Sequence, residues 1–402
     1  MNYIDRHISN YILNASKTFP VVILTGARQI GKTTLFEHIA KDNRKIVSLD
    51  NPILRQNAKE DPEKFLQTYS PPVLIDEIQY APELFPYIKI LVDKHKKNGE
   101  FWLTGSQSFT MMKSITESLA GRVAIIKMCN LSSAEIDNRK IIPIDFNIDN
   151  LIKFNKNKED VNVNKIFKRI FAGSYPKIWA EKNIDIRLFY NSYIDTYITR
   201  DLRSIKNIEN ETSFINFLKI VASRTATNVN YEKLANEANI TAPTAKVWLS
   251  ILVSSGLVLL IEPYFSNVLK RVVKAPRMYM TDTGLVTNLM GWETPEVLEA
   301  SYLSGAIFET YIVNEIYKNF VNRGERPSLY FYRNNSKEEI DLIIEKNQVM
   351  HPIEIKKSAN PKNPLKNFKS IKGNIGTGYV YCLCNEIVPI SKKDYLVPAN
   401  LI

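Results

Sequence analysis

The stretch VVILTGARQIGKTTLFEHIA, Val21–Ala40, decides how the first part of this 402-residue chain folds. Its four leading apolar residues, VVIL, predict a buried strand, and the pattern TLFEHIA from Thr34 onward predicts a helix. Between them GARQIGKT, Gly26–Thr33, fits the phosphate-binding pattern G-x-x-x-x-G-K-[ST]. A strand before this loop and a helix after it are the context that the pattern requires, and a chance Gly-Lys turn is the alternative.

The loop offers the groups that would hold the phosphates of ATP. Its backbone N–H groups and the N-terminus of the following helix would surround the phosphates. Lys32 would reach the β- and γ-phosphates, and the Thr33 hydroxyl would bind Mg²⁺, so ATP and Mg²⁺ are the expected cofactors. The predicted nucleotide-binding residues are Gly26, Ala27, Arg28, Gln29, Ile30, Gly31, Lys32, Thr33, Thr34 and Ser106.

A second apolar strand, VLIDEIQ at 73–79, ends in two carboxylates. Asp76 would hold Mg²⁺ through water, and Glu77 would polarise the water that attacks the γ-phosphate. Two acids at the end of a strand are also common as solvated charges. The phosphate-binding loop upstream favours the catalytic interpretation.

Two further positions are candidates for the same reaction. Ser106 and Gln107 follow the strand FWLTGS, where either could sense the γ-phosphate or orient the water, and a capping role is the alternative. Arg122 stands directly before the strand VAIIKM. It could stabilise phosphate charge in the same or a neighbouring subunit, or it is a surface arginine.

The pattern of strands and helices predicts three modules. Alternating strands and helices from Val21 to Met128 predict a mostly parallel sheet covered by helices, so 1–140 is expected to be the ATPase domain. Residues 141–165 contain an Asn-, Asp- and Lys-rich run and predict a linker or an inserted loop. Residues 166–300 are mainly helical, and 301–402 read as a second α/β unit, giving an α/β protein overall.

Within the middle module, residues 229–264 predict helix, turn, helix and a strand pair, with Thr241 as N-cap and Gly256 as helix stop. The exposed face of the second helix offers one lysine, Lys246, and few residues that could read bases. The segment that follows the first strand of this pair is more basic than the exposed face of the second helix. Its cations are Lys270, Arg271, Lys274 and Arg277.

The stretch EEIDLIIEKNQVMHPIEIKKS, Glu338–Ser358, predicts a β-hairpin with Asn347-Gln348 as its loop. Asp341, Glu354 and Lys356 interrupt its apolar strands, and a charge in such a strand is costly without a partner. Residues two apart in a strand share a face, so Glu354 and Lys356 point the same way. Pairing within the hairpin would bring Asp341 close to both.

Ten segments, in order, resemble a prokaryotic family of AAA-type ATPases in which a winged-helix segment and a restriction-endonuclease-like domain follow the ATPase. The segments are GARQIGKTTL, VLIDEIQ, LTGSQ, ESLAGR, GSYPKI, SYIDTYITRDL, YEKLANEANI, KAPRMYMTDTGL, GAIFETYIVNEI and FYRNNSKEEIDLIIE with PIEIKKS. The resemblance covers nearly the whole chain and implies ATP binding. In ATPases of this kind a winged helix either reads DNA or packs on the nucleotide domain as a lid, and both roles stay open.

The array D…E-x-K in the hairpin resembles the active centre of PD-(D/E)XK nucleases. The resemblance implies that Asp341 and Glu354 bind Mg²⁺ beside a scissile phosphate, while Lys356 positions or activates water or stabilises the developing charge. The alternative is a surface ion pair between Lys356 and the two acids. The glutamates that could supply a further ligand are Glu309 as first choice, Glu315 as a weaker one, and Glu339.

The net charge of +11 suits a polyanionic partner, DNA rather than RNA, without requiring one. The first residues, MNYIDRHIS, lack an apolar signal core, and no apolar run reaches membrane-spanning length, so a cytoplasmic protein is expected. The leading hypothesis is an ATPase whose nucleotide state controls a Mg²⁺-dependent nuclease-like domain. The rivals are an ATP-dependent nucleic-acid-binding regulator with an inactive nuclease fold, and a signalling switch acting on another protein. A homo-oligomer is left open.

Overall fold

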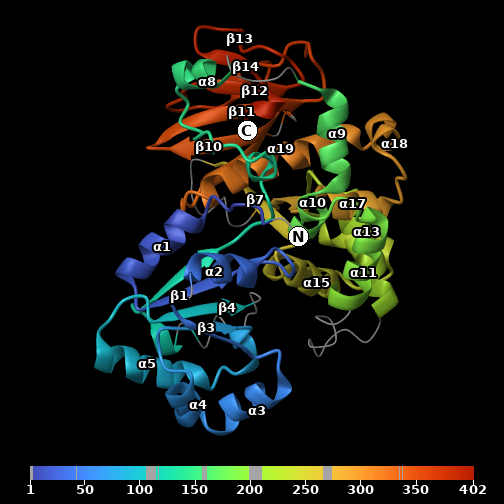
Figure 1. Ribbon diagram of the computed structural model, residues 1–402. Helices are drawn as coiled ribbons and strands as arrows, with labels where there is room; N and C mark the ends of the chain where they lie inside the picture. The colour runs from blue at the N-terminus through green and yellow to red at the C-terminus, as the bar shows by residue number, and fades with distance from the viewer. Residues whose placement is uncertain are drawn as a thin grey trace.

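The computed structural model describes residues 3–41, 43–105, 115, 117–155, 161–198, 211–265, 274–334, 336 and 338–402. The described strands form two sheets, one of five strands and one of nine. In Figure 1 the five-stranded sheet and its helices form one end of the molecule, the C-terminal strands form the other, and the remaining helices lie between and beside them. The chain is therefore mixed α/β throughout.

The five-stranded sheet is parallel, as the sequence predicts, with strand order β2-β3-β4-β1-β5. Its strands are β1 Val21–Thr25, β2 Lys45–Ser48, β3 Val73–Asp76, β4 Phe101–Gly105 and β5 Val123–Lys127. The central strands β1, β3 and β4 are buried along their whole length, as expected of a parallel sheet with helices on both faces. Alternate residues of β1 enter different apolar layers: Val22 and Leu24 enter one, and Val21 and Ile23 the other.

The helices around this sheet are mostly short. They are α1 Ser9–Thr18, α2 Lys32–Ala40, α3 Pro52–Glu60, α4 Pro62–Thr68, the 3₁₀ turn η1 Ile78–Tyr80, and α5 Leu84–His95. Leu35 and Phe36 of α2 pack in the layer with Val22 and Leu24, whereas Phe85 of α5 packs in the opposite layer. The phosphate-binding loop thus runs between the end of a buried strand and a helix held against the same sheet.

Most of the middle of the chain is helical. Its helices are α7 Ser133–Ile136, α8 Ile148–Asn155, α9 Val163–Ala172, α10 Pro176–Ala180, α11 Ile186–Tyr193, the π-helix η2 Ile194–Ile198, α13 Glu211–Ser223, α14 Tyr231–Ala238, α15 Ala242–Ser254, α17 Thr283–Met290, α18 Pro295–Ala300 and α19 Ser304–Val321. The helix–turn–helix prediction is confirmed, whereas of the strand pair predicted within 229–264 only β7 lies there, and its antiparallel partner β8 lies at 277–280. Thr241 accepts the Thr244 N–H as N-cap of α15, and β7 pairs antiparallel with β8.

The expectation of a linker or inserted loop over 141–165 is wrong for its middle, where α8 forms. Phe146 stacks on His351 with ring centroids 3.6 Å apart, and Leu151 of α8 is buried. In Figure 1 this segment runs back to the C-terminal strands and α8 lies beside them. A few apolar anchors in a polar stretch give too weak a periodicity to be recognised as a helix.

The nine-stranded sheet has the order β13-β14-β12-β11-β10-β9-β7-β8-β6. Its strands are β6 Thr227–Asn228, β7 Val258–Pro263, β8 Arg277–Met280, β9 Ser328–Arg333, β10 Glu339–Lys346, β11 Val349–Lys356, β12 Gly378–Cys382, β13 Val388–Pro389 and β14 Asp394–Pro398; two 3₁₀ turns, η3 Phe368–Ser370 and η4 Ala399–Leu401, flank the last strands. Strands β7 and β9 pair in parallel through Glu262↔Tyr330 and Pro263↔Phe331. The predicted boundary between 166–300 and 301–402 therefore lies within one continuous sheet.

Among the described residues no helix combines the length and the apolar character needed to cross a membrane. Four residues of the sequence-based predictions, Ser106, Gln107, Lys270 and Arg271, lie outside the described residues.

Candidate functional sites

The phosphate-binding loop has the backbone that its glycines permit. Gly26 has φ +150°, and a Cβ there would lie 2.4 Å from the carbonyl oxygen of Met128, so no side chain fits. Gly31 has φ +87° and directly precedes α2, which begins at Lys32. The loop therefore closes onto the N-terminus of a helix, where free N–H groups and the helix dipole favour an anion.

Lys32 is buried and points into the loop. Its Nζ donates hydrogen bonds to the carbonyl oxygens of Gly26, 3.2 Å away, and Ala27, 2.8 Å away. Two backbone carbonyl oxygens of the loop thus fix the position of this ammonium group. This is the arrangement expected of the residue that meets the phosphates of a nucleotide.

Asp76, at the end of β3, gathers three hydroxyl groups around one buried carboxylate. Its Oδ1 accepts from Thr33 Oγ1 at 2.5 Å and also from the Thr104 hydroxyl, and its Oδ2 accepts from Ser48 Oγ at 3.1 Å. Thr33 and Asp76, the two residues expected to hold Mg²⁺, therefore lie in hydrogen-bond contact. Hydroxyl and carboxylate oxygens are the donors that Mg²⁺ takes, so the residues present fit the expected ion.

Sequence reasoning missed Ser48 and Thr104. Both are polar residues near the ends of otherwise apolar parallel strands, and β2 and β4 flank β3 in the sheet. Because the carboxyl ends of parallel strands meet at one edge, their position was a usable signal once the strand order was known.

Glu77 occupies an uncommon backbone conformation directly after Asp76. Its φ is +56°, its N–H donates to Thr104 Oγ1 at 3.2 Å, and its carboxylate accepts from the Gln79 amide. A non-glycine residue at positive φ is maintained by its surroundings and is frequent at functional sites. The turn separates the Glu77 carboxylate from the strand while fixing its orientation.

Arg122 requires a correction. It precedes β5 at the edge where β1 begins, since the Val21 N–H bonds to the Arg122 carbonyl oxygen, whereas the phosphate-binding loop follows the other end of β1. Its guanidinium is exposed and forms a bidentate ion pair with Asp93, at 2.6 and 3.0 Å. The five residues of β1 span roughly 16 Å, so Arg122 cannot serve the loop of its own chain.

Arg6, a buried arginine that the sequence analysis did not single out, holds the backbone of the phosphate-binding loop. Arg6 donates to the carbonyl oxygens of Ile30 at 2.9 Å and Cys129 at 2.7 Å, and its Nε donates to Glu135 Oε1 at 3.1 Å. Burial alone would raise the pKa of Glu135. Arg6 and the backbone N–H donors of Ser132 and His7 outweigh burial and hold that pKa below its usual value.

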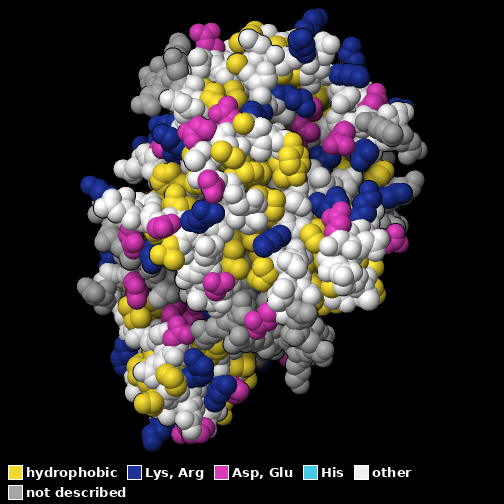
Figure 2. All heavy atoms as spheres, turned by 90° about the vertical axis from the view of Figure 1, so that its right-hand side faces the viewer, with side chains coloured by type: hydrophobic (Ala, Val, Ile, Leu, Met, Phe, Trp, Pro, Cys, Tyr) yellow, Lys and Arg dark blue, Asp and Glu magenta, His cyan; other side chains and the backbone are white. Residues whose placement is uncertain are grey.

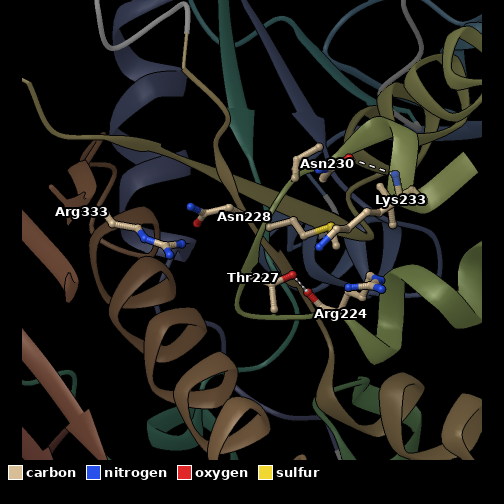
Figure 3. A pocket seen from close by; sticks show the side chains of 9 residues that line it. Arg224, Thr227, Asn228, Asn230, Lys233 and Arg333 are labelled. Atoms are coloured by element: carbon tan, nitrogen blue, oxygen red, sulfur yellow. Dashed lines mark hydrogen bonds between the residues drawn. The ribbon is translucent and has the colours of Figure 1, made fainter. Parts of the chain in front are cut away.

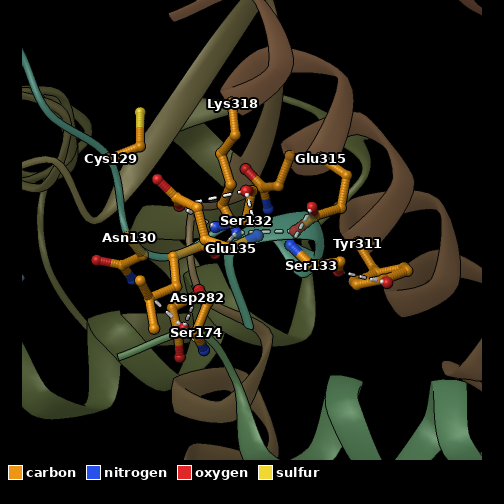
Figure 4. A network of polar contacts seen from close by, with 12 residues as sticks. Cys129, Asn130, Ser132, Ser133, Glu135, Ser174, Asp282, Tyr311, Glu315 and Lys318 are labelled. Atoms are coloured by element: carbon orange, nitrogen blue, oxygen red, sulfur yellow. Dashed lines mark hydrogen bonds and ion pairs between the residues drawn. The ribbon is translucent and has the colours of Figure 1, made fainter. Parts of the chain in front are cut away.

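From Glu135 the polar contacts continue into α19, as Figure 4 shows. The Ser133 N–H donates to Glu315 Oε2 at 2.8 Å, and Lys318 Nζ donates to Glu315 Oε1 at 2.9 Å and to the Leu131 carbonyl at 2.8 Å. Glu315 is therefore committed to this junction, and its candidacy as a metal ligand is wrong. The junction links the ATPase segment after β5 to the helix in front of the C-terminal strands.

A second buried acid, Asp282, fastens the helical region to the same segment (Figure 4). Its Oδ2 accepts from the Ser174 N–H at 2.7 Å and from Asn130 Nδ2 at 3.4 Å, and its Oδ1 accepts from Tyr190 OH at 2.7 Å. Asp282 also caps α17 by accepting the Leu285 N–H at 2.8 Å. The Asp282 carboxylate thus joins the segments around residues 130, 174 and 190 to its own helix, α17.

The C-terminal hairpin forms as predicted. Asn347 and Gln348 both have positive φ, +51° and +61°, as a two-residue turn between antiparallel strands requires. Lys356 Nζ lies 2.6 Å from Glu354 Oε1 and 3.9 Å from Asp341 Oδ2. The predicted meeting of Asp341, Glu354 and Lys356 is therefore confirmed as geometry.

A bulge shapes this cluster. Between β10 and β9 the register shifts between Ile340 and Ile343, which places an extra residue in β10 at Asp341 and Leu342. Asp341 Oδ2 accepts the backbone N–H of Ile355 at 2.8 Å, so its carboxylate turns across the hairpin. Bulges re-aim side chains in this way and are over-represented next to active sites.

Glu309 does not complete a three-carboxylate metal site, contrary to the prediction. Its Oε1 accepts from Tyr279 OH at 2.8 Å and lies 3.3 Å from Arg277, and Arg277 also pairs with Glu339. Within the described parts of the chain no group of three or more His, Cys, Asp or Glu side chains is arranged to hold a metal. The physical reason is Arg277, a buried cation that takes up both glutamates.

Glu309, Glu354 and Asp341 together carry more negative charge than the nearby cations neutralise. Burial, and then the charge of Asp341, raises the pKa of Glu309 to about 8 and that of Glu354 to about 7. Burial also raises the pKa of Asp341 above its usual value. Within the described part of the chain, Glu354 Oε2 is buried and has no hydrogen-bond partner. A divalent cation bound by Asp341 and Glu354 would supply that partner, and two carboxylates with substrate oxygens suffice for Mg²⁺.

Three family models match successive parts of the chain. An AAA domain matches residues 18–137, a domain of unknown function (DUF8612) matches 163–296, and another domain of unknown function (DUF4143) matches 304–402. An uncharacterized protein of Mycobacterium tuberculosis is 27% identical over 343 residues, which are 85% of this chain and 71% of that protein. A protein of Mycobacterium bovis, also uncharacterized, matches equally well.

Two solved structures are among those that resemble the chain. A Walker-type ATPase of Pyrococcus abyssi is 16% identical with a TM-score of 0.44 and covers 72% of this chain and 96% of its own. The RuvB Holliday junction branch migration motor of Thermotoga maritima is 18% identical with a TM-score of 0.30, covering 62% and 86%. The family match over 18–137, together with the loop geometry, supports an ATP-binding P-loop ATPase domain of the AAA type in this chain.

Proposed function

We propose that this protein hydrolyses ATP and that its nucleotide state controls a metal-dependent, nuclease-like site in its C-terminal part. The observation that carries the proposal is the cluster of Asp341, Glu354 and Lys356, in which a buried carboxylate oxygen of Glu354 has no hydrogen-bond partner among the residues that the structure describes. A chain that already handles the phosphates of ATP thus holds a second set of side chains suited to phosphate chemistry.

In the ATPase site the residues of this chain have distinct roles. Lys32 would neutralise charge on the β- and γ-phosphates, while Thr33 and Asp76 would hold Mg²⁺. Glu77 accepts a proton from the attacking water, which its fixed turn orients. Bound Mg²⁺ offsets negative charge on the phosphate oxygens.

At the C-terminal site Asp341 and Glu354 would hold a divalent ion, which when bound lowers the pKa of its water and offsets charge on a phosphodiester. Lys356 lies within 2.6 Å of Glu354 and would orient the attacking water or stabilise charge on the phosphate. The order of elements α19, β9, β10, β11 and β12, with β11 parallel to β12, supports a restriction-endonuclease-like core.

The helical region fits a winged helix. Its elements α13, β6, α14, α15, β7 and β8 follow one another in the chain, and β8 pairs with both β6 and β7. Control by ATP would pass through the contacts from Ile30 to Arg6 and Glu135, and from Ser133 to Glu315. Helix α19 carries both Glu315 and Glu309. Movement of the ATPase part would therefore shift α19 relative to Asp341, Glu354 and Lys356, called here the acidic cluster.

The test is cleavage of plasmid and single-stranded DNA with Mg²⁺ or Mn²⁺, with and without ATP. Wild-type protein is compared with Glu354→Ala and Lys32→Ala. Cleavage that Glu354→Ala abolishes, and that loses its ATP dependence in Lys32→Ala, is the expected result. ATP-independent cleavage that both variants retain would overturn the proposal.

A second candidate function is an ATP-dependent regulator that binds nucleic acid without cutting it. It is favoured by the capture of Glu309 and Glu339 by Arg277, which leaves only two carboxylates for a metal. The same experiment separates the two functions. Absence of cleavage by wild-type protein under every condition, with nucleic-acid binding that Glu354→Ala retains, would favour the regulator.

A further inference from the structure

A cavity of about 340 Å³ opens beside the acidic cluster, between the start of α14 and the end of β9. Three cations line it, Arg224, Lys233 and Arg333, and none of its nine described lining residues is acidic. On the face shown in Figure 2, Lys and Arg side chains are scattered among acidic and apolar ones and form no single band. The cavity thus brings three cations together in a chain whose net charge is +11.

The cations approach the cavity from different elements (Figure 3). Arg333 of β9 lies on one side, Arg224 and Lys233 lie on the other, and Asn228 of β6 lies between them and points toward Arg333. Arg224 is paired with Glu237, and Arg333 lies 3.6 Å from Glu339. Lys233 is exposed, and its Nζ makes no ion pair within the described part of the chain. Lys233 also interacts electrostatically with Glu237, so the three cations of the cavity share two neighbouring carboxylates, Glu237 and Glu339, and a net positive charge remains.

One side chain joins this cavity to Glu309 and Glu339, two glutamates that interact electrostatically with Asp341 of the acidic cluster. Arg277 Nε donates to Asn228 Oδ1 at 3.3 Å, while its terminal nitrogens reach Glu309 at 3.3 Å and Glu339. Since Asn228 Oδ1 is occupied by Arg277, its Nδ2 is the atom left to donate a hydrogen bond to a ligand. Arg277 is buried, so the spacing between cavity and cluster is fixed.

We propose that the cavity binds a phosphate group of a nucleic-acid strand and so positions a nearby phosphodiester of that strand at Asp341 and Glu354. The inference rests on the proposed function of that cluster. The buried carboxylates of Asp341 and Glu354 repel a polyanion until a metal is bound. The positively charged cavity near them would hold the nucleic-acid strand in place. The cavity has the size of a small-ligand site, roughly 300–1,000 Å³, enough for one nucleotide unit.

The test measures binding of a short fluorescent single-stranded deoxyoligonucleotide without terminal phosphates, in EDTA so that no cleavage intervenes. Asn228→Asp keeps the acceptor for Arg277 but replaces the free amide with a carboxylate oxygen in the cavity. It should weaken binding at least tenfold. Lys233→Gln should weaken binding and reduce the dependence of log affinity on log salt by about one unit. Lys59 on α3 is also exposed, so Lys59→Gln is the matched control. It should change neither the affinity for the oligonucleotide nor its salt dependence.

Each outcome decides the inference. Wild-type affinity in both cavity variants, or an equal loss in Lys59→Gln, would overturn it. A deoxynucleoside monophosphate that binds in competition with sulfate, while Asn228→Asp leaves oligonucleotide binding unchanged, would assign the cavity to a free nucleotide and overturn the strand proposal. Thermal unfolding of each variant shows that it is folded. Failure of metal-dependent cleavage by wild-type protein, measured separately, would count against the proposed nuclease function and not against this binding site.

Discussion

Gly256, directly after α15, lies against Ala27 in the phosphate-binding loop. A Cβ on Gly256 would be 3.4 Å from the Ala27 backbone nitrogen and 3.5 Å from its Cβ. Gly256 has φ +78°, and its carbonyl oxygen accepts the Thr281 hydroxyl at 2.6 Å. The helical region thus packs against the phosphate-binding loop at Ala27.

This contact predicts a size-dependent effect at Gly256. Gly256→Ala fits the space and should cost about 1 kcal/mol of stability, because alanine disfavours positive φ. Gly256→Leu carries the same backbone cost but its larger side chain must displace Ala27, so ATP affinity should fall severalfold further. The measurement is ATP titration of both variants beside thermal unfolding. Equal ATP affinities in the two variants would show that the contact does not bear on the loop.

Glu77→Gln should separate ATP binding from hydrolysis. Removing a general base lowers turnover by on the order of 100- to 10,000-fold, while the loop that holds the phosphates is unchanged. Steady-state phosphate release and equilibrium ATP binding are measured on the same protein. Turnover within a few-fold of wild type would assign the activation of water to another residue.

The buried pair of Arg6 and Glu135 predicts a pH-dependent stability. Because the folded-state pKa of Glu135 is below its usual 4.5, the stability it contributes is present above pH 4.5 and is lost as pH falls below that value. Glu135→Gln should lower the free energy of unfolding at pH 7 by roughly 3–5 kcal/mol, since it leaves Arg6 buried and unpaired. The difference from wild type should shrink below pH 4.5.

The control for that prediction is the exposed pair of Arg122 and Asp93. Asp93→Asn should have little effect on stability at any pH, because solvent screens the charges. Denaturant unfolding at several pH values measures both variants. A loss in Glu135→Gln that does not diminish in acid would mean that packing rather than charge makes position 135 important.

Arg122 can act on a nucleotide only if a second copy of the chain presents it. Arg122→Ala should therefore leave ATP affinity and the turnover of dilute protein unchanged. If the wild-type turnover per chain rises with protein concentration, the rise should be absent in Arg122→Ala. A variant that is slow even in dilute protein would contradict the position of Arg122 at the far edge of the sheet.

Metal binding at the C-terminal cluster should be visible as a change in stability. At pH 8, Mn²⁺ at about 100 times its dissociation constant should add about 2.7 kcal/mol to wild-type protein. Glu354→Gln should respond less, because one of the two ligands is neutral, and EDTA should reverse the effect. Lys32→Ala should keep the response, since it removes only the nucleotide site. An equal response in wild type and Glu354→Gln would place the ion elsewhere.

Local patterns were enough to predict much of this structure. The five parallel strands, the loop from Gly26 to Thr33, the N-cap Thr241 and the turn at Asn347 are each encoded within a few residues. The contact of Lys356 with Glu354 followed from the two-residue period of a strand.

What could not be predicted depends on residues far apart in the chain. Arg6 meets Glu135 across 129 positions, and Ser133 meets Glu315 across 182. Arg277 looked like a basic residue of a wing, yet it is buried and redirects Glu309 away from a metal. No periodicity reports such contacts, because they are decided when whole elements pack together.

The pairing of β7 with β9 has a consequence for how the chain can be divided. A fragment beginning near residue 301 would expose the edge of β9, and its open N–H and C=O groups would recruit strands of other copies. Such a fragment should aggregate or pair with itself. The fragment that ends near residue 300 should do the same through the exposed edge of β7. A fragment that keeps this sheet whole must therefore include β7 and β8 together with the C-terminal strands.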